Sequence, residues 1–167
     1  KITPQAYAEL VQTARAAIPG LAITTDLIVG FPGETEAEFT ASYEFVQAME
    51  FAGGHIFTYS ARPGTAAARM SGQVPHALRK QRNRQMQCLF AQAAQATQAQ
   101  WIGSRLPVLW ERALPNGDNA WLLSGLTDTY CRVTAQSDAN LWNQISLVAL
   151  TAQIDGGMQG IICDRNP

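Results

Sequence analysis

The segment 26–70 constrains the fold most, because one amphipathic helical pattern separates two apolar runs that each lead into a Gly/Pro-containing loop. The runs are 21–29 and 55–59, and Thr35 and Glu38 form a capping box at the start of the helical pattern between them. Such strand–helix–strand units build parallel sheets, whose ligands bind at the carboxyl ends of the strands. We therefore predict an α/β fold with its chemistry in the two loops.

Asp26 interrupts the first apolar run, which otherwise has the composition of a strand covered on both faces. A carboxylate inside such a strand is costly unless it is paired or faces a solvated cavity. Asp26 is either a structural residue bonded to backbone groups or a polar group that faces a site. We favour the site, because the loop begins only four residues later, at Gly30.

Charge is distributed unevenly along the chain. Residues 1–50 contain seven acids and two bases, residues 51–110 contain no acid and seven bases, and residues 111–167 contain six acids and three bases. An acid-free block predicts a surface for a polyanion, although a solvated basic helix face is an equal alternative. Its bases are Arg62, Arg69, Arg79, Lys80, Arg82, Arg84 and Arg105. Four of them stand early in a predicted helix, 75–101, where the helix dipole disfavours positive charge.

After Gly103 the pattern changes to short strands separated by turn residues. Five short strands within about sixty residues predict a small antiparallel β-barrel. The predicted strands are 105–112, 120–124, 129–134, 145–150 and 160–163. We therefore predict two domains, 1–102 and 103–167.

Three widely spaced cysteines, Cys88, Cys131 and Cys163, fit neither a disulfide framework nor a local metal site. We expect reduced and mostly buried thiols, as in a cytoplasmic protein. The sequence contains no apolar run long enough for a membrane span, so we expect no membrane partner.

Two motifs carry a resemblance to a known family. Residues 25–35 read Thr-Asp-Leu-Ile-Val-Gly-Phe-Pro-Gly-Glu-Thr, and residues 59–67 read Tyr-Ser-Ala-Arg-Pro-Gly-Thr-Ala-Ala. Together they resemble the radical S-adenosylmethionine methylthiotransferases, which modify tRNA adenosines beside the anticodon or an aspartate of a ribosomal protein. The segments 106–111, 125–130 and 160–162 are similar to the family's TRAM domain, a small RNA-binding β-barrel. His55 and the Arg-Pro-Gly-Thr form at 62–65 look most like the threonylcarbamoyladenosine branch.

The resemblance implies the C-terminal portion of a partial TIM-like radical SAM barrel followed by a TRAM barrel. The family's cysteine triad is missing, so we expect no catalytic residue and no metal ligand here, and no activity of this chain alone. The whole enzyme would use S-adenosylmethionine, two 4Fe–4S clusters, a reductant protein and tRNA. The implied cofactor-binding residues are Ile28, Gly30, Tyr59 and Ser60. Asp26 and the seven bases named above would face the substrate RNA.

Two other readings compete with this one. A non-catalytic RNA-binding module would need only the basic block and the barrel. A hydrolase-like or sugar enzyme is disfavoured, because no nucleophile–base set or carboxylate pair stands at the predicted strand ends. In any of these cases we expect self-association through an exposed edge of a strand in the first part.

Overall fold

A computed structural model describes residues 2–117 and 119–164, and the chain divides into two compact units, 1–94 and 95–167. The first unit contains four helices and two strands, and α4 ends in the second unit. These elements are α1 (Pro4–Ala17), β1 (Thr24–Val29), α2 (Glu36–Met49), β2 (Gly53–Thr58), α3 (Ala66–Arg69) and α4 (His76–Gln100). The second unit contains β3 (Arg105–Pro115), β4 (Trp121–Thr127), β5 (Arg132–Ser137), β6 (Ile145–Ile154) and β7 (Gly157–Asp164). The domain division at residue 102 stays a prediction.

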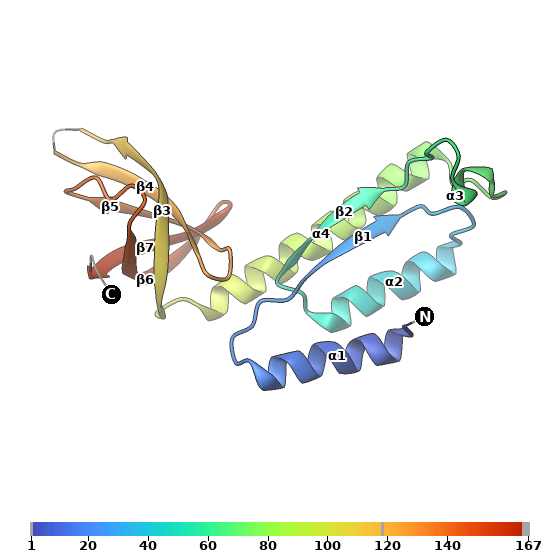
Figure 1. Ribbon diagram of the computed structural model, residues 1–167, viewed down its shortest axis with the longest axis horizontal. Helices are drawn as coiled ribbons and strands as arrows, with labels where there is room; N and C mark the ends of the chain where they lie inside the picture. The colour runs from blue at the N-terminus through green and yellow to red at the C-terminus, as the bar shows by residue number, and fades with distance from the viewer. Residues whose placement is uncertain (1, 118, 165–167) are drawn as a thin grey trace. The chain divides into compact units, whose positions relative to one another are not determined.

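Strands β1 and β2 are parallel neighbours, as the strand–helix–strand pattern predicts. Their register runs from the pair Thr24 and Gly53 to the pair Val29 and Thr58. Both strands point toward the segment that contains α3 (Figure 1). The two loops that follow the strands therefore begin side by side at one edge of the sheet.

Only one face of this two-stranded sheet is covered. Leu27, Val29 and Ile56 pack into a core with side chains of α1, α2 and α4, including Val11, Phe39 and Met86. The opposite face is open and carries Thr24, Asp26 and Ile28 of β1 and His55 and Phe57 of β2. Ile28 is 56% exposed and Phe57 is 52% exposed. The expectation of a strand covered on both faces is therefore wrong for β1 in this chain.

The sheet also has two unpaired edges, because β1 and β2 form no further strand pair among the described residues. Free edges offer rows of unpaired backbone groups to other chains. Self-association through these edges stays a prediction.

Helix α2 begins with the capping box that the sequence predicts. The Glu38 N–H donates to Thr35 Oγ1 at 3.2 Å, and the Thr35 N–H donates to Glu38 Oε2 at 2.8 Å. These bonds satisfy backbone donors that the first turn of a helix leaves without partners. The hydrogen bonds from the Thr35 backbone and hydroxyl lower the pKa of Glu38.

Thr35→Ala is expected to lower the free energy of unfolding by about 1 kcal/mol, because the cap is lost. The hydrogen bonds to the Glu38 carboxylate stabilise the folded state at pH values above the pKa of Glu38 in the unfolded chain. This stabilisation is lost as the pH falls through the lowered pKa of Glu38 in the folded state. The penalty should therefore shrink in acid. Urea unfolding followed by far-UV circular dichroism measures it, with Thr40→Ala in the exposed middle of the same helix as control. Equal losses in the two variants would contradict the capping role.

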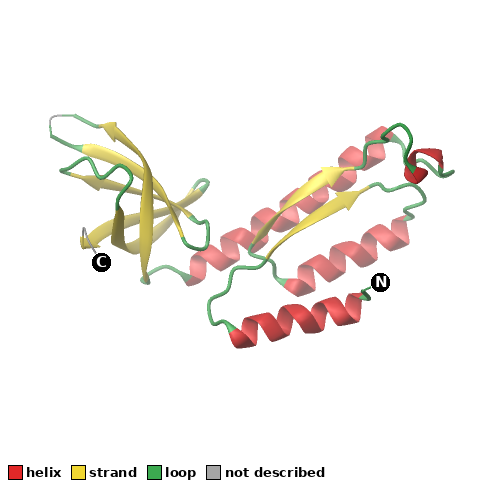
Figure 2. Cartoon of the chain, in the orientation of Figure 1, coloured by secondary structure: helices red, strands yellow, loops and turns green. Residues whose placement is uncertain are grey.

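The second unit is a closed five-stranded barrel with the strand order β3-β4-β5-β7-β6 (Figure 2). The predicted small β-barrel is confirmed, but its antiparallel character is incomplete, because β5 and β7 pair in parallel at Val133 with Met158. The barrel interior is apolar, and the Trp110 ring nitrogen donates to the buried hydroxyl of Ser146 at 3.0 Å. Residues 129–131, predicted as part of a strand, lie in the turn between β4 and β5 instead.

The cysteines do not follow the prediction of mostly buried thiols. Cys88 and Cys163 are exposed, and only Cys131 is buried. Burial raises the pKa of the Cys131 thiol, which keeps it protonated and poorly reactive.

Candidate functional site

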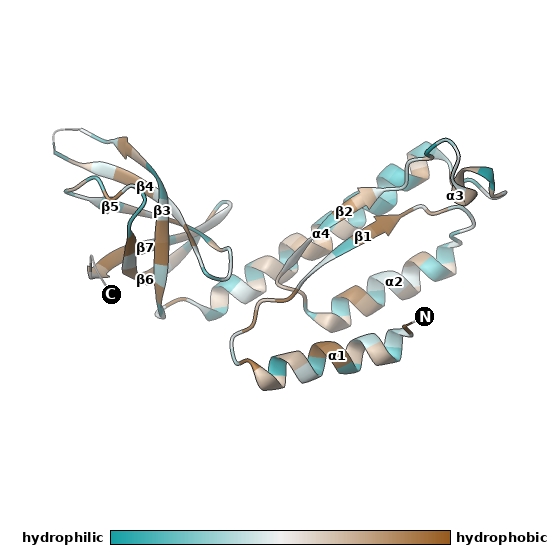
Figure 3. Ribbon diagram, in the orientation of Figure 1, coloured by the Kyte–Doolittle hydropathy of each residue, from teal (hydrophilic) through white to brown (hydrophobic). Residues whose placement is uncertain are grey.

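The loops that follow β1 and β2 are tied together by backbone hydrogen bonds. The Tyr59 N–H donates to the Val29 carbonyl at 2.9 Å, and the Gly33 N–H donates to the Gly72 carbonyl at 2.8 Å. Both loops thus lie at the carboxyl edge of the sheet, where the sequence places the site. Figure 3 shows the apolar ends of β1 and β2 that lead into them.

Glu34 connects the first loop to helix α4. Its Oε2 accepts the Gly30 N–H at 2.8 Å, and its Oε1 accepts Nη1 of Arg82 at 2.8 Å. One carboxylate therefore closes the loop on itself and also fixes it to the helix. Both oxygens of the Glu34 carboxylate are thus engaged inside the protein.

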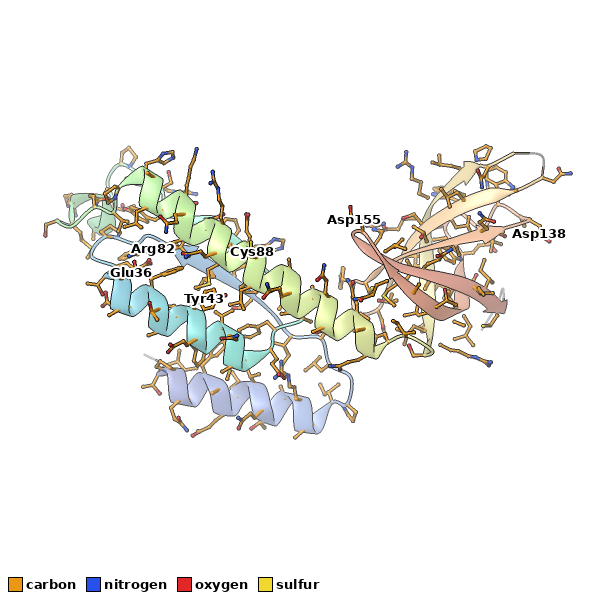
Figure 4. All side chains as sticks on the ribbon, turned by 180° about the vertical axis from the view of Figure 1, so that it is seen from behind. Glu36, Tyr43, Arg82, Cys88, Asp138 and Asp155 are labelled. Carbon is orange, nitrogen blue, oxygen red and sulfur yellow. The ribbon has the colours of Figure 1, made fainter. Side chains whose placement is uncertain are left out.

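Arg82 is a buried ion-pair residue, with only 2% of its side chain exposed. In addition to its bond with the Glu34 carboxylate, the Arg82 guanidinium donates to the Glu34 backbone carbonyl at 3.0 Å and to Glu36 Oε2 at 2.9 Å. It also lies 5.1 Å from the centre of the Phe39 ring. Arg82 and Glu36 point toward one another between α4 and α2 (Figure 4). In this structure the Arg82 charge is paired with the carboxylates of Glu34 and Glu36 inside the protein, so its RNA contact stays a prediction that the buried ion pair does not support.

Arg79 fastens the second loop in a similar way. Its Nη1 donates to the Tyr59 carbonyl, and its aliphatic carbons fill the space where a side chain on Gly30 would lie. Gly30 has a φ of +73° and is buried, so this position needs glycine both for its backbone angle and for its contact with Arg79. Arg79 is half-buried, and its guanidinium is engaged by a backbone carbonyl rather than by a carboxylate. Its predicted contact with RNA stays a prediction.

Three polar side-chain atoms beside these loops are buried and have no hydrogen-bond partner among the described residues. They are the Tyr59 hydroxyl, Nε of Arg79 and Nε of Arg82. Buried polar atoms are normally hydrogen-bonded, so unpaired ones at a strand-end loop indicate a place for a bound molecule or water. The Tyr59 ring itself packs edge-on against Phe31, with 5.3 Å between ring centres.

The structure brings together the four residues predicted to bind the cofactor. Ile28 lies near the end of β1, and Gly30 follows directly after that strand. Tyr59 and Ser60 follow directly after the neighbouring strand β2. Ile28 and Ser60 are exposed, whereas Gly30 and Tyr59 are buried. The exposed Ile28 side chain therefore lies on the open face, and the exposed Ser60 side chain lies where the chain leaves β2.

The open face adds polar groups to this edge. Asp26 and His55 are register partners on neighbouring strands, and so are Ile28 and Phe57. Sequence reasoning assigned a role in the site to Asp26 but not to His55 or Phe57. Side chains alternate between the two faces of a strand, so Asp26 and Ile28 are expected on the same face of β1. The parallel register between β1 and β2 would have placed His55 and Phe57 on that face as well.

The remaining predicted RNA-binding bases are exposed. They are Arg62, Arg69, Lys80, Arg84 and Arg105. Arg69 donates weakly to the Gly64 carbonyl at 3.5 Å, and none of the five forms an ion pair within residues 2–117 and 119–164. Their charges are available to an external anion, so their RNA contacts stay predictions.

Over the same part of the chain, no group of three His, Cys, Asp or Glu side chains is placed to hold a metal ion. None of the described helices is long and apolar enough for a membrane span.

Comparisons with known proteins decide the family. No family model matches the chain. It is 35% identical over 150 residues to the threonylcarbamoyladenosine tRNA methylthiotransferase MtaB of Bacillus subtilis, which covers 90% of this chain and 33% of that protein. It is 39% identical over 149 residues to a tRNA-2-methylthio-N(6)-dimethylallyladenosine synthase of Moorella thermoacetica, covering 89% of this chain and 33% of that protein. The chain is homologous to part of the tRNA methylthiotransferases.

The sequence resemblance to the methylthiotransferases is thereby confirmed. The chain spans about a third of the length of these relatives. A Mycobacterium bovis synthase is 44% identical over 103 residues, which is 62% of this chain. Because the relatives' names refer to both modified adenosines, the choice of the threonylcarbamoyl branch stays a prediction.

Proposed function

We propose that this chain forms the C-terminal part of a radical SAM tRNA methylthiotransferase, which adds a methylthio group to a modified adenosine next to the anticodon. The 35% identity to the Bacillus subtilis enzyme over 90% of the chain carries the proposal. The parallel pair β1 and β2 supports it, since helices cover one face and the other is open, as for neighbouring strands of a β/α barrel. An enzyme of this kind acts in the cytoplasm, where its tRNA is.

S-adenosylmethionine fits the carboxyl edge of β1 and β2. Ile28 offers an exposed apolar surface for an adenine ring, and Ser60 offers a hydroxyl beside it. Gly30 and Tyr59 shape the floor, where the Tyr59 hydroxyl is still without a partner. When bound, S-adenosylmethionine supplies the methyl group and the radical chemistry of the reaction. This chain's residues would bind and orient it, and Asp26 would face the substrate from the same open side.

The clusters and the electron supply belong, in this proposal, to the rest of the enzyme. A 4Fe–4S cluster needs cysteine thiolates grouped around it. The described residues do not fit such a cluster, because they contain no group of metal-binding side chains. The reductant protein would therefore act on the other part of the enzyme.

The exposed bases of the first unit form the proposed tRNA surface, with Lys80 and Arg84 on α4, Arg62 in the loop before α3 and Arg69 at the end of α3. Arg105, at the start of β3 in the second unit, would make a separate contact with tRNA. Phosphate contacts release counterions, so binding should weaken as salt rises.

Replacing Lys80 and Arg84 together with alanine tests the proposal in the whole enzyme. We expect weaker tRNA binding and a salt slope that is flatter by roughly 2 units, if each base meets one phosphate. Titrations of labelled tRNA at several salt concentrations measure both. Gln81→Ala with Gln85→Ala is the matched control, since these neighbours are exposed and neutral. Unchanged affinity and slope in the Lys80/Arg84 variant would assign the bases to a solvated helix face.

A further inference from the structure

Tyr130 has the most exposed large hydrophobic side chain of the described residues, at 84%. It lies in the turn between β4 and β5 with a φ of +61°. Bulky residues rarely adopt this left-handed conformation, because it strains the backbone. The turn thus holds a strained residue whose ring packs against little of the protein.

The turn around Tyr130 is held firmly. The Thr127 N–H donates to the Cys131 carbonyl at 3.0 Å, and the Tyr130 N–H donates back to the Thr127 carbonyl at 3.0 Å. The Thr127 hydroxyl accepts the Cys131 N–H at 3.0 Å and shares a hydrogen bond with the Thr129 hydroxyl at 2.8 Å. Thr127 and Cys131 are both buried. The ring is therefore presented from a rigid base, which lowers the entropy lost when a ligand binds it.

The two strands joined by this turn and the neighbouring β3 carry an apolar and cationic row on the outside of the barrel. Leu109, Leu126 and Arg132 are successive register partners across β3, β4 and β5. Leu109 is exposed, and Arg132 is half exposed in an ion pair with Glu111 at 2.8 Å. The surface next to the turn thus offers apolar area and a guanidinium with little net charge. Such a surface suits a flat, uncharged ring better than a phosphate.

We propose that Tyr130 is a stacking residue for an unpaired base of RNA. This inference rests on the proposed tRNA function and assigns to the barrel a contact with bases, whereas the basic residues of α4 would contact phosphates. Aromatic side chains bind unpaired bases through their ring faces, and Arg planes assist. A base on the ring would also explain why a strained tyrosine stands where glycine would fit without strain.

The test uses the full chain and an RNA hairpin whose unpaired loop carries 2-aminopurine, a fluorescent base that is quenched when stacked. Tyr130→Gly and Tyr130→Asn remove the ring and tolerate the left-handed backbone, whereas Tyr130→Phe and Tyr130→Trp keep a ring. We expect the ringless variants to lose roughly tenfold in affinity and to lose the quenching, since one stacked base contributes about 1–3 kcal/mol. The ring-bearing variants should bind as the wild type does. Trp142→Ala, which removes another exposed aromatic side chain of the barrel unit, is the matched control.

Thermal unfolding accompanies each titration, because a folding defect would also weaken binding. Tyr130→Gly should unfold at the same temperature as the wild type or higher, since strain is relieved and no packing is lost. Wild-type affinity and quenching in both ringless variants would overturn the stacking role while leaving the tRNA function in place. A wild-type chain that binds no RNA would overturn the stacking role together with the RNA surface proposed here.

Discussion

Arg82→Met is expected to destabilise the first unit by about 3 kcal/mol, the lower end of the cost of removing one partner from a buried ion pair. The substitution removes hydrogen bonds to the Glu34 carboxylate, the Glu34 carbonyl and Glu36. The Glu34 carboxylate is only 15% exposed. It would keep its hydrogen bond from the Gly30 N–H but would lose the positive charge of the arginine that pairs with it. Glu36 is 73% exposed and can return to water, so most of the cost arises at Glu34.

The chain offers separate probes for its two units. All four tryptophans lie after residue 95, so tryptophan fluorescence reports the barrel unit. Far-UV circular dichroism reports mainly the helices, of which α1, α2 and α3 lie wholly in the first unit. In urea, Arg82→Met should lower the helical midpoint and leave the fluorescence midpoint unchanged. Arg84→Met is the matched control, since Arg84 is exposed two residues further along the same helix. Equal effects of the two substitutions would show that Arg82 does not fasten the loop.

The different positions of Arg82 and Lys80 show where sequence reasoning reaches its limit. Both belong to one basic cluster near the start of α4, and a helix dipole argument treats them alike. Their environments differ because two acids more than forty residues earlier in the chain, Glu34 in a loop and Glu36 at the start of α2, form bonds to Arg82. Whether an arginine is buried depends on such distant partners, and the local sequence pattern does not show which partners will meet it.

Elements that depend on local chemistry were predictable. The capping box at Thr35 and Glu38 fixes the start of α2, and alternation together with turn residues predicts the small barrel. The parallel pairing of β5 with β7 was not predictable in this way, because closure of the barrel depends on which strands meet in space. The open face of β1 was missed for a related reason. An apolar run indicates which residues avoid water but not whether this chain supplies a cover for both faces.

Gly30→Ala is expected to destabilise the first unit by about 3 kcal/mol, through backbone strain and a steric clash together. A Cβ at residue 30 would lie 2.2 Å from Cγ, 2.8 Å from Cδ and 3.1 Å from Cβ of Arg79. The Arg79 side chain cannot simply swing away, because its guanidinium donates to the Tyr59 carbonyl. Gly33→Ala separates the two causes. Gly33 has a φ of +88° but no neighbour within 4 Å of its Cβ position, so strain alone should cost about 1 kcal/mol.

A double-mutant cycle identifies Arg79 as the obstacle. Arg79→Ala alone should destabilise the unit, because Tyr59 loses its donor and the loop loses packing. In the Gly30→Ala/Arg79→Ala double variant, the contacts with Arg79 Cγ and Cδ are gone. The stability losses of the two single variants should therefore sum to about 1 kcal/mol more than the loss measured for the double variant. The same cycle with Gly33→Ala should be additive. Additivity in the Gly30 cycle would place the cost in the backbone angle alone. A coupling there would show that α4 fastens the loop after β1 through side-chain contact, which is why this loop needs glycine at position 30.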